Sequence, residues 1–156
     1  MAPILDREEL RAFVAEKRAN GLKIILANGC FDLIHAGHIR YLQGARDLGG
    51  TLVVGINSDE QVRLLKGSNR PYISENDRAE IVAALRMVDA VTIFDEPTVE
   101  ELIFAIKPDF HAKGTDYSVD TVPERETVKS YGGTIAIVGD PKDHSSSELA
   151  KKVADA

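Results

Sequence analysis

Two histidines and two glycines lie close together in the segment 28–38, NGCFDLIHAGH. His35 and His38 are three residues apart, so at the start of a helix both imidazoles face roughly the same side. A helix N-terminus exposes backbone N–H groups and a partial positive charge, which attract phosphate oxygens. Gly37 has no Cβ to obstruct an approaching phosphate. The segment therefore predicts a phosphate site that two imidazoles help to form.

Cations and hydroxyls elsewhere in the chain could bind the same phosphates. Lys66 offers a movable point charge, and Arg78 offers a planar fork that matches a phosphate. The serines at 145–147 precede Glu148 in a capping-box pattern, which predicts a second helix N-terminus suited to an anion. None of these residues is an evident nucleophile. The set therefore favours direct in-line attack by a substrate over a covalent enzyme intermediate.

Each of these residues also has a simpler interpretation. The two histidines could be zinc ligands, although the single cysteine and the lack of a nearby third ligand count against that. Cys30 could be a nucleophile, but a small buried thiol at a tight turn is the expected role. Lys66 and Arg78 could be solvated surface charges, and Asp32 could only cap a turn. The sequence contains no GxxxxGK[ST] and no GxGxxG, which counts against the commonest nucleotide folds.

Alternating strands and helices must position these residues. Apolar runs predict strands at 23–27, 51–57, 90–94, 109–112 and 135–138. Helical spacing predicts helices from about 7 to 20, 38 to 48, 60 to 65, 75 to 87, 97 to 106 and 123 to 131, and a last one from 145. In the helix 75–87, the residues expected to face inward are Ile81, Ala84, Leu85 and Val88. Because parallel strands need crossover connections, the pattern predicts a three-layer, doubly wound α/β fold with a parallel five-stranded sheet.

The predicted sheet would bring distant segments together. Ligands of such sheets bind at the carboxyl ends of the strands, so the polar segments after strands one, two, four and five should meet at one edge. The segment 66–71, KGSNRP, is rich in turn formers and carries two cations. It predicts a mobile loop, and the sequence leaves open whether this loop closes over a substrate.

Composition limits the class of protein. The 156 residues fit one domain, 1–156, and the formal net charge of −6 argues against a general nucleic-acid binder. Cys30 is the only cysteine, so no intrachain disulfide can form. The N-terminal segment lacks the pattern of a secretory signal, and no apolar stretch is long enough for a membrane span. A cytoplasmic location without membrane attachment is expected.

The segment 29–38 resembles the GxFDxxHxGH signature of the cytidylyltransferase-like nucleotidyltransferases. Further similarity lies in LQGARDLGGTLVVGINSDEQVRLLKGSNRP, Asp77-Arg78, KGTDY at 113–117 and SSSELAKKV at 145–153. Together these resemble the adenylyltransferase domain of ADP-heptose synthases in its stand-alone form. The resemblance covers the chain from about residue 5 onward and implies a Rossmann-like HxGH nucleotidyltransferase fold.

The resemblance implies an enzyme that transfers AMP from ATP, with Mg²⁺, to D-glycero-β-D-manno-heptose 1-phosphate, giving ADP-heptose and pyrophosphate. It implies catalytic roles for His35, His38 and Lys66, and substrate binding by Lys66 and Arg70. Asp32 would help to hold the cation and the first turn, and Arg78 would support the phosphates. The resemblance also implies that the nucleotide is bound by Asn28, Gly29, Cys30, Phe31, Asp32, Gly37, Arg78, Lys113, Gly114, Asp116, Ser145, Ser146 and Ser147. A homodimer is expected on the same basis.

Two other functions remain open from the sequence. One keeps the mechanism but uses CTP with glycerol 3-phosphate or another alcohol phosphate. The other is a nucleotide-binding module without turnover, because a fold alone does not settle function.

Overall fold

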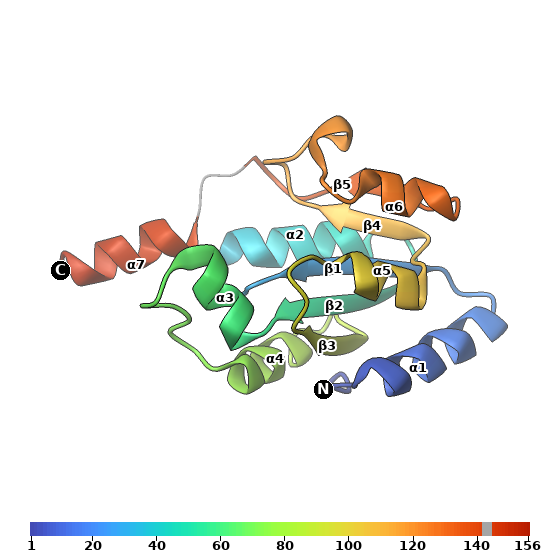
Figure 1. The fold of residues 1–156 in the computed structure, drawn as a ribbon, viewed down its shortest axis with the longest axis horizontal. Coiled ribbons are helices and arrows are strands. Elements are labelled where there is room, and N and C mark those ends of the chain that lie inside the picture. The colour runs from blue at the N-terminus through green and yellow to red at the C-terminus, as the bar shows by residue number, and fades with distance from the viewer. Residues whose placement is uncertain (142–144) are drawn as a thin grey trace.

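Five parallel strands form one sheet in the order β3-β2-β1-β4-β5 (Figure 1). The structure is a computed structural model and describes residues 1–141 and 145–156. The strands are β1 (Ile24–Gly29), β2 (Thr51–Asn57), β3 (Ala90–Phe94), β4 (Phe110–Lys113) and β5 (Thr134–Ile137). Strand β2 is buried along its whole length, which explains why its sequence is a continuous apolar run rather than an alternating one.

Helices cover both faces of the sheet. They are α1 (Arg7–Ala19), α2 (Ala36–Arg46), α3 (Asp59–Lys66), α4 (Glu75–Ala83), α5 (Glu100–Ile106), α6 (Arg125–Ser130) and α7 (Ser146–Ala154), with a 3₁₀ turn η1 (Val119–Thr121). In β1, Ile25 and Ala27 join the core formed with α2 and α4, whereas Ile24 and Leu26 join the core formed with α1, α5 and α6. This alternation places a layer of helices on each side, so the predicted three-layer fold is confirmed.

Two helices begin later than predicted. Helix α5 begins at Glu100 rather than at residue 97, and α6 begins at Arg125 rather than at residue 123. Neither N-cap residue, Val99 or Glu124, makes a side-chain cap hydrogen bond, and the Thr98 hydroxyl accepts only a long one from the Glu100 N–H (3.4 Å), so the polar signal at the true start is weak. Strand β1 also runs two residues past the predicted end, to Gly29. Among the described residues, no helix is both long and apolar enough for a membrane span.

Helix α4 turns a different face to the sheet than predicted. It ends at Ala83, and its buried residues are Arg78, Ala79, Val82 and Ala83. Ile81, predicted to face inward, is 40% exposed, and Val88 is buried but lies beyond the helix. The prediction was wrong because it oriented the helix by apolar residues alone. The buried side chain of Arg78 determines which side faces the protein interior.

Candidate active site

A cleft of about 640 Å³ lies at the carboxyl ends of the strands. Every strand contributes a residue from its end or from just beyond it: Asn28, Asn57, Phe94, Lys113 and Val138. Strands β2 and β3 lie on one side of β1, and β4 and β5 lie on the other, so the chain changes direction between β1 and β4. Ligands of doubly wound sheets bind at this switch point. The polar segments after β1, β2, β4 and β5 therefore share one cleft.

The two imidazoles hold each other at the start of α2. His35 is the N-cap, and its Nδ1 accepts a hydrogen bond from the backbone N–H of Gly37 (3.2 Å). The Nδ1 of His38 accepts from the backbone N–H of His35 (3.3 Å), and the two rings stack with centroids 3.9 Å apart. A neutral ring that accepts at Nδ1 carries its proton on Nε2. Both histidines line the cleft, so each can donate an Nε2–H to an anion beside the helix N-terminus.

The turn before α2 is strained at Phe31. Its φ of 50° lies in the left-handed region that side chains rarely adopt, which costs about 1–3 kcal/mol. The Phe31 ring is buried and lies 5.2 Å from the ring of His38, centroid to centroid. A Cβ at Gly29 would come within 3.1 Å of this ring, so Gly29 leaves room for it. The glycine and the strained phenylalanine together shape the wall behind the imidazoles.

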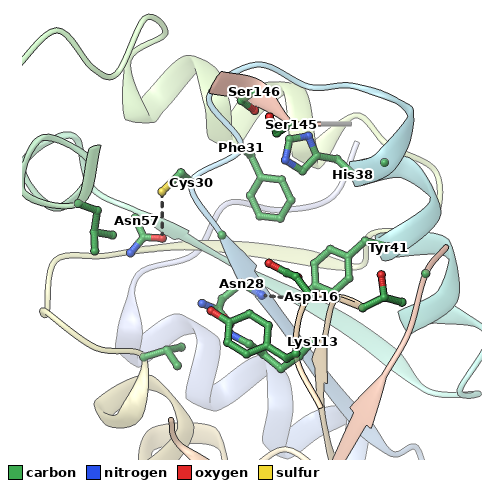
Figure 2. A pocket seen from close by; sticks show the side chains of 18 of the residues that line it. Asn28, Cys30, Phe31, His38, Tyr41, Asn57, Lys113, Asp116, Ser145 and Ser146 are labelled. Atoms are coloured by element: carbon green, nitrogen blue, oxygen red, sulfur yellow. Dashed lines mark hydrogen bonds between the residues drawn. The ribbon is translucent and has the colours of Figure 1, made fainter. Parts of the chain in front are cut away.

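The start of α7 faces the same cleft. Ser145 caps the helix by accepting a hydrogen bond from the N–H of Glu148 (3.0 Å), as its sequence pattern predicts. The hydroxyl of Ser146 donates to the carbonyl of Leu33 (3.1 Å), which fastens α7 to the turn that carries the histidines. Figure 2 shows Ser145 and Ser146 beside His38. Two helix N-termini from opposite ends of the chain therefore open onto one cavity.

Tyr41 separates the two strands at the switch point. The ladder pairs Ile25 with Phe110 and Leu26 with His111. Further along, the Tyr41 hydroxyl donates to the carbonyl of Ala112 (2.7 Å) and accepts from the N–H of Asn28 (3.3 Å). Burial raises the pKa of this hydroxyl, so it stays protonated. The phenol thus bridges β1 and β4 where the cleft opens between them (Figure 2).

Residues 26–152 match the model of a family described as cytidylyltransferase-like. The chain belongs to the cytidylyltransferase-like family. The family resemblance read from the sequence is therefore confirmed. Among curated proteins, the chain is 48% identical over 150 residues to the bifunctional protein HldE of Pelobacter propionicus and 47% identical over 151 residues to that of Methylobacillus flagellatus. The matches cover 96% and 97% of this chain but only 31% of each relative, so the chain spans under a third of their length.

Two solved structures are similar to this fold. A lipopolysaccharide core biosynthesis protein from Thermoplasma volcanium is 28% identical, with a TM-score of 0.67 over 78% of this chain and 100% of that one. A pantoate-beta-alanine ligase from Francisella tularensis has a TM-score of 0.63 over all of this chain and 79% of its own. At 16% identity, the second likeness shows the fold alone.

Asp32, expected to help hold a cation, instead binds the segment 70–73 of its own chain. Its carboxylate accepts from the Nε of Arg70 (2.5 Å) and from the backbone N–H groups of Tyr72 and Ile73 (2.9 and 3.0 Å). Burial alone would raise the pKa of Asp32, but these donors outweigh it and lower the pKa. Asp32 and Arg70 are buried and do not line the cleft. In this member of the cytidylyltransferase-like family, the pair anchors the segment that follows α3.

Arg78, expected to support the phosphates, also lies behind the cleft. Its side chain is fully buried. The guanidinium donates to the carbonyls of Ile73 (3.0 Å), Cys30 (2.6 Å) and Asn57 (2.9 Å), and to the carboxylate of Asp59 (2.8 Å). A group already bound to four acceptors is not available to a phosphate in this conformation. Arg78 instead ties the ends of β1 and β2 to the starts of α3 and α4.

A buried charged cluster lies beside β4, and no sequence pattern predicted it. Lys113 and Glu124 line the cleft, with the Lys113 Nζ 3.2 Å from the Oε1 of Glu124. His111, fully buried beneath them, lies with its Nε2 2.6 Å from the same oxygen. Burial alone would raise the pKa of Glu124, but the His111 hydrogen bond and the Lys113 charge lower it to about 2. Burial lowers the pKa of His111, so its ring is neutral at pH 7 and donates its Nε2–H.

Cys30 lies in the cleft wall with its Sγ 3.7 Å from the Oδ1 of Asn57 (Figure 2). Burial raises the pKa of the thiol, against the opposing charges of Lys66 and Arg78. A raised pKa keeps the thiol protonated at pH 7, and the thiolate is the nucleophilic form. The geometry therefore gives Cys30 a packing role.

The structure brings most of the expected site residues together. Those that line the cleft are Asn28, Gly29, Cys30, Phe31, His35, Gly37, His38, Lys66, Lys113, Gly114, Asp116, Ser145, Ser146 and Ser147. Lys66 is the last residue of α3 and is exposed. The cleft residues that sequence reasoning missed include Arg40, Tyr41, Asn57, Tyr117 and Glu124. Asn57 carried a signal as the polar last residue of an apolar strand, and Tyr117 is the last residue of the KGTDY segment.

The residues fit a cation that arrives with its nucleotide. Among the residues that the structure describes, no group of three or more His, Cys, Asp or Glu side chains could hold a metal ion. The Asp32 oxygens are occupied by three protein donors. Mg²⁺ in nucleotide enzymes is commonly held by substrate phosphates and one or two carboxylates, and Asp116 lines the cleft.

Proposed function

We propose that this chain is an adenylyltransferase that transfers AMP from ATP to a sugar 1-phosphate, D-glycero-β-D-manno-heptose 1-phosphate. The products are ADP-heptose and pyrophosphate. The family supports nucleotidyl transfer, and the curated relatives support the choice of substrates. The single observation that carries the proposal is the meeting of two helix N-termini and two stacked imidazoles in one cleft.

The reaction is a direct displacement. An oxygen of the acceptor phosphate attacks the α-phosphorus of ATP and forms a new P–O bond. The bond from that phosphorus to the oxygen bridging the β-phosphate breaks, and pyrophosphate leaves with the electron pair. His35 and His38 donate Nε2–H groups to phosphate oxygens whose charge grows in the transition state, and the fold fixes these donors beforehand. Lys66 holds the two reacting phosphates together against their repulsion.

Mg²⁺ bound to ATP would screen the phosphate charge, and Asp116 is one of the carboxylates in the cleft that could contact it. The α7 N-terminus at Ser145, Ser146 and Ser147 binds a phosphate through its backbone N–H groups. Both helix starts are tied to the turn between β1 and α2, so a triphosphate can bridge them without a large rearrangement.

A panel of nucleotides and acceptors tests the proposal. ATP and CTP are each offered with heptose 1-phosphate, glycerol 3-phosphate and no acceptor, and pyrophosphate is measured. We expect release with ATP and heptose 1-phosphate only. Release with CTP and glycerol 3-phosphate would show the cytidylyltransferase instead. Tight ATP binding with no transfer to either acceptor would show a binding module without turnover.

Two substitutions of His38 separate its catalytic donor from its structural acceptor. In His38→Asn, the amide oxygen can replace Nδ1 and accept from the His35 N–H, but the Nε2–H donor is lost. In His38→Gln, the amide nitrogen can replace Nε2 as a donor. We expect His38→Asn to lower kcat by about 10²- to 10³-fold, with His38→Gln retaining more activity. Equal kcat values for His38→Asn and the unmodified protein would refute the donor role.

A further inference from the structure

The wall of the cleft includes residues of both core layers, and we call the two parts of this wall its limbs. One limb is walled by Tyr41 and Val138, which pack against the core formed with α2 and α4. The other limb is walled by Phe94, Val99 and Tyr117, which belong to the core formed with α1, α5 and α6. The imidazoles and the α7 start would bind the phosphates of both proposed substrates, ATP and the sugar 1-phosphate. One limb is then left for the nucleoside and the other for the sugar.

The second limb carries groups that bind hydroxyls. Asn57, Thr98, Lys113 and Glu124 line the cleft, and Lys113 lies over the ring of Tyr117 with its Nζ 4.7 Å from the ring centroid. Figure 2 shows Lys113 at the other end of the cleft from His38 and Ser146. A carboxylate repels the acceptor nitrogens N1, N3 and N7 of adenine, but it accepts strongly from hydroxyls. An amide, a hydroxyl, an ammonium and a carboxylate together suit a substrate that has several hydroxyl groups.

Glu124 is held so that one of its oxygens can serve a ligand. His111 Nε2 and Lys113 Nζ both reach Oε1, at 2.6 and 3.2 Å. Within residues 1–141 and 145–156, no hydrogen-bond donor is found for Oε2, and this atom is not among the fully buried side-chain atoms that lack a partner. Glu124 itself lines the cleft although it is only 6% exposed. We therefore take Oε2 as the oxygen that a ligand in the cleft would reach.

We propose that Glu124 is the specificity-determining residue that accepts hydrogen bonds from the hydroxyl groups of the sugar part of the acceptor. The inference rests on the proposed function and names the residue that distinguishes a sugar phosphate from a simple phosphate. His111 is a positioning residue, since it holds Glu124 from below and is too buried to touch a ligand. Lys113 balances the charge of Glu124, so the limb presents an acceptor without a net negative charge.

Binding measurements with Glu124→Gln test the proposal. The amide oxygen can still accept from His111 and Lys113, while the group facing the cleft changes from a charged acceptor to a neutral donor. We expect the Kd for heptose 1-phosphate to rise by about 10- to 100-fold, the effect of losing a hydrogen bond to a charged group. The Kd for a non-hydrolysable ATP analogue and the inhibition constant of methyl phosphate, which has no hydroxyl, should stay within about 3-fold.

Other outcomes overturn the proposal. An unchanged Kd for heptose 1-phosphate would remove the role. A weaker ATP analogue would assign Glu124 to the nucleotide, and equal weakening of methyl phosphate would show that it acts through Lys113. Glu124→Asp keeps the charge but shortens the side chain by one methylene. If Glu124→Gln does not fold, the same Kd and inhibition measurements on Glu124→Asp test the proposal. Heptose 1-phosphate that binds through Glu124 but receives no AMP would refute the proposed function alone.

Discussion

Replacing Tyr41 with phenylalanine should show how much the bridge between β1 and β4 contributes to stability. The hydroxyl satisfies two backbone groups, the carbonyl of Ala112 and the N–H of Asn28. Ala112 is fully buried, so its carbonyl would lose its partner in a place that water reaches poorly. Each unpaired buried group costs about 1–3 kcal/mol, and the Asn28 side of the bridge borders the cleft, where water can compensate in part. We therefore expect Tyr41→Phe to lower the free energy of unfolding by about 2–4 kcal/mol.

Tyr131→Phe is the matched control. That hydroxyl makes one hydrogen bond, to the carbonyl of Pro108 at 2.9 Å, in a half-buried position. Its loss should cost about 0.5–1.5 kcal/mol. Urea unfolding followed by circular dichroism measures both variants. For a chain of this size, the Tyr41 variant should also melt about 5–15 °C lower than the unmodified protein.

A local measurement makes the reasoning refutable. If Tyr41 holds the strands at the switch point, the amide of Asn28 should exchange its hydrogen faster in Tyr41→Phe, while amides in the middle of β2 should keep their protection. Equal losses of stability in the Tyr41 and Tyr131 variants, with unchanged exchange at Asn28, would show that the two Tyr41 hydrogen bonds do not stabilise the junction of β1 and β4.

Two further predictions concern buried charges. Arg78→Lys should lower the free energy of unfolding by about 3 kcal/mol or more, because one ammonium cannot reach four acceptors. Urea titrations measure this loss, and Arg86→Lys, at an exposed arginine, is the control. Equal effects would contradict the clamp role. The pKa of Glu124 falls from its ordinary 4.5 to about 2 on folding, so its contribution is complete above about pH 5 and is lost as pH falls toward 2. The stability difference between the unmodified protein and Glu124→Gln should therefore shrink from pH 5 to 3, and a constant difference would be inconsistent with this linkage.

The fold was predictable because its main signals are local. The continuous apolar run of β2 and the glycines and serines that end or begin helices mark most elements. The rule that parallel strands need crossovers then orders them. The convergence of the histidines and the serine cap on one cleft follows from that topology, although the two segments are more than 100 residues apart.

Burial of charge was not predictable, because it depends on partners far along the chain. Arg78 and Asp32 have the residue types of phosphate and cation ligands. The residues next to them in sequence do not indicate that Arg78 binds the carbonyls of Cys30 and Asn57, or that Asp32 binds the N–H of Tyr72. Glu124 was missed for a related reason. It lies ten or more residues from the nearest predicted strand end, and only β4 brings His111 and Lys113 to it.

Under the proposed function, the buried charges of Arg78 and Asp32 would keep the site in its binding geometry before substrate arrives. A triphosphate and an acceptor phosphate repel each other, so the protein must present donors that cannot turn away. Arg78 and Asp32 do not line the cleft, and they fix the chain on either side of the β1 turn. The Nδ1 atoms of His35 and His38 are held by backbone N–H groups of the same turn, which directs the opposite ring nitrogens outward. Under the proposed function, Arg78 and Asp32 would act on catalysis through the position of the imidazoles, and loosening either charge should lower turnover without removing any group that touches a phosphate.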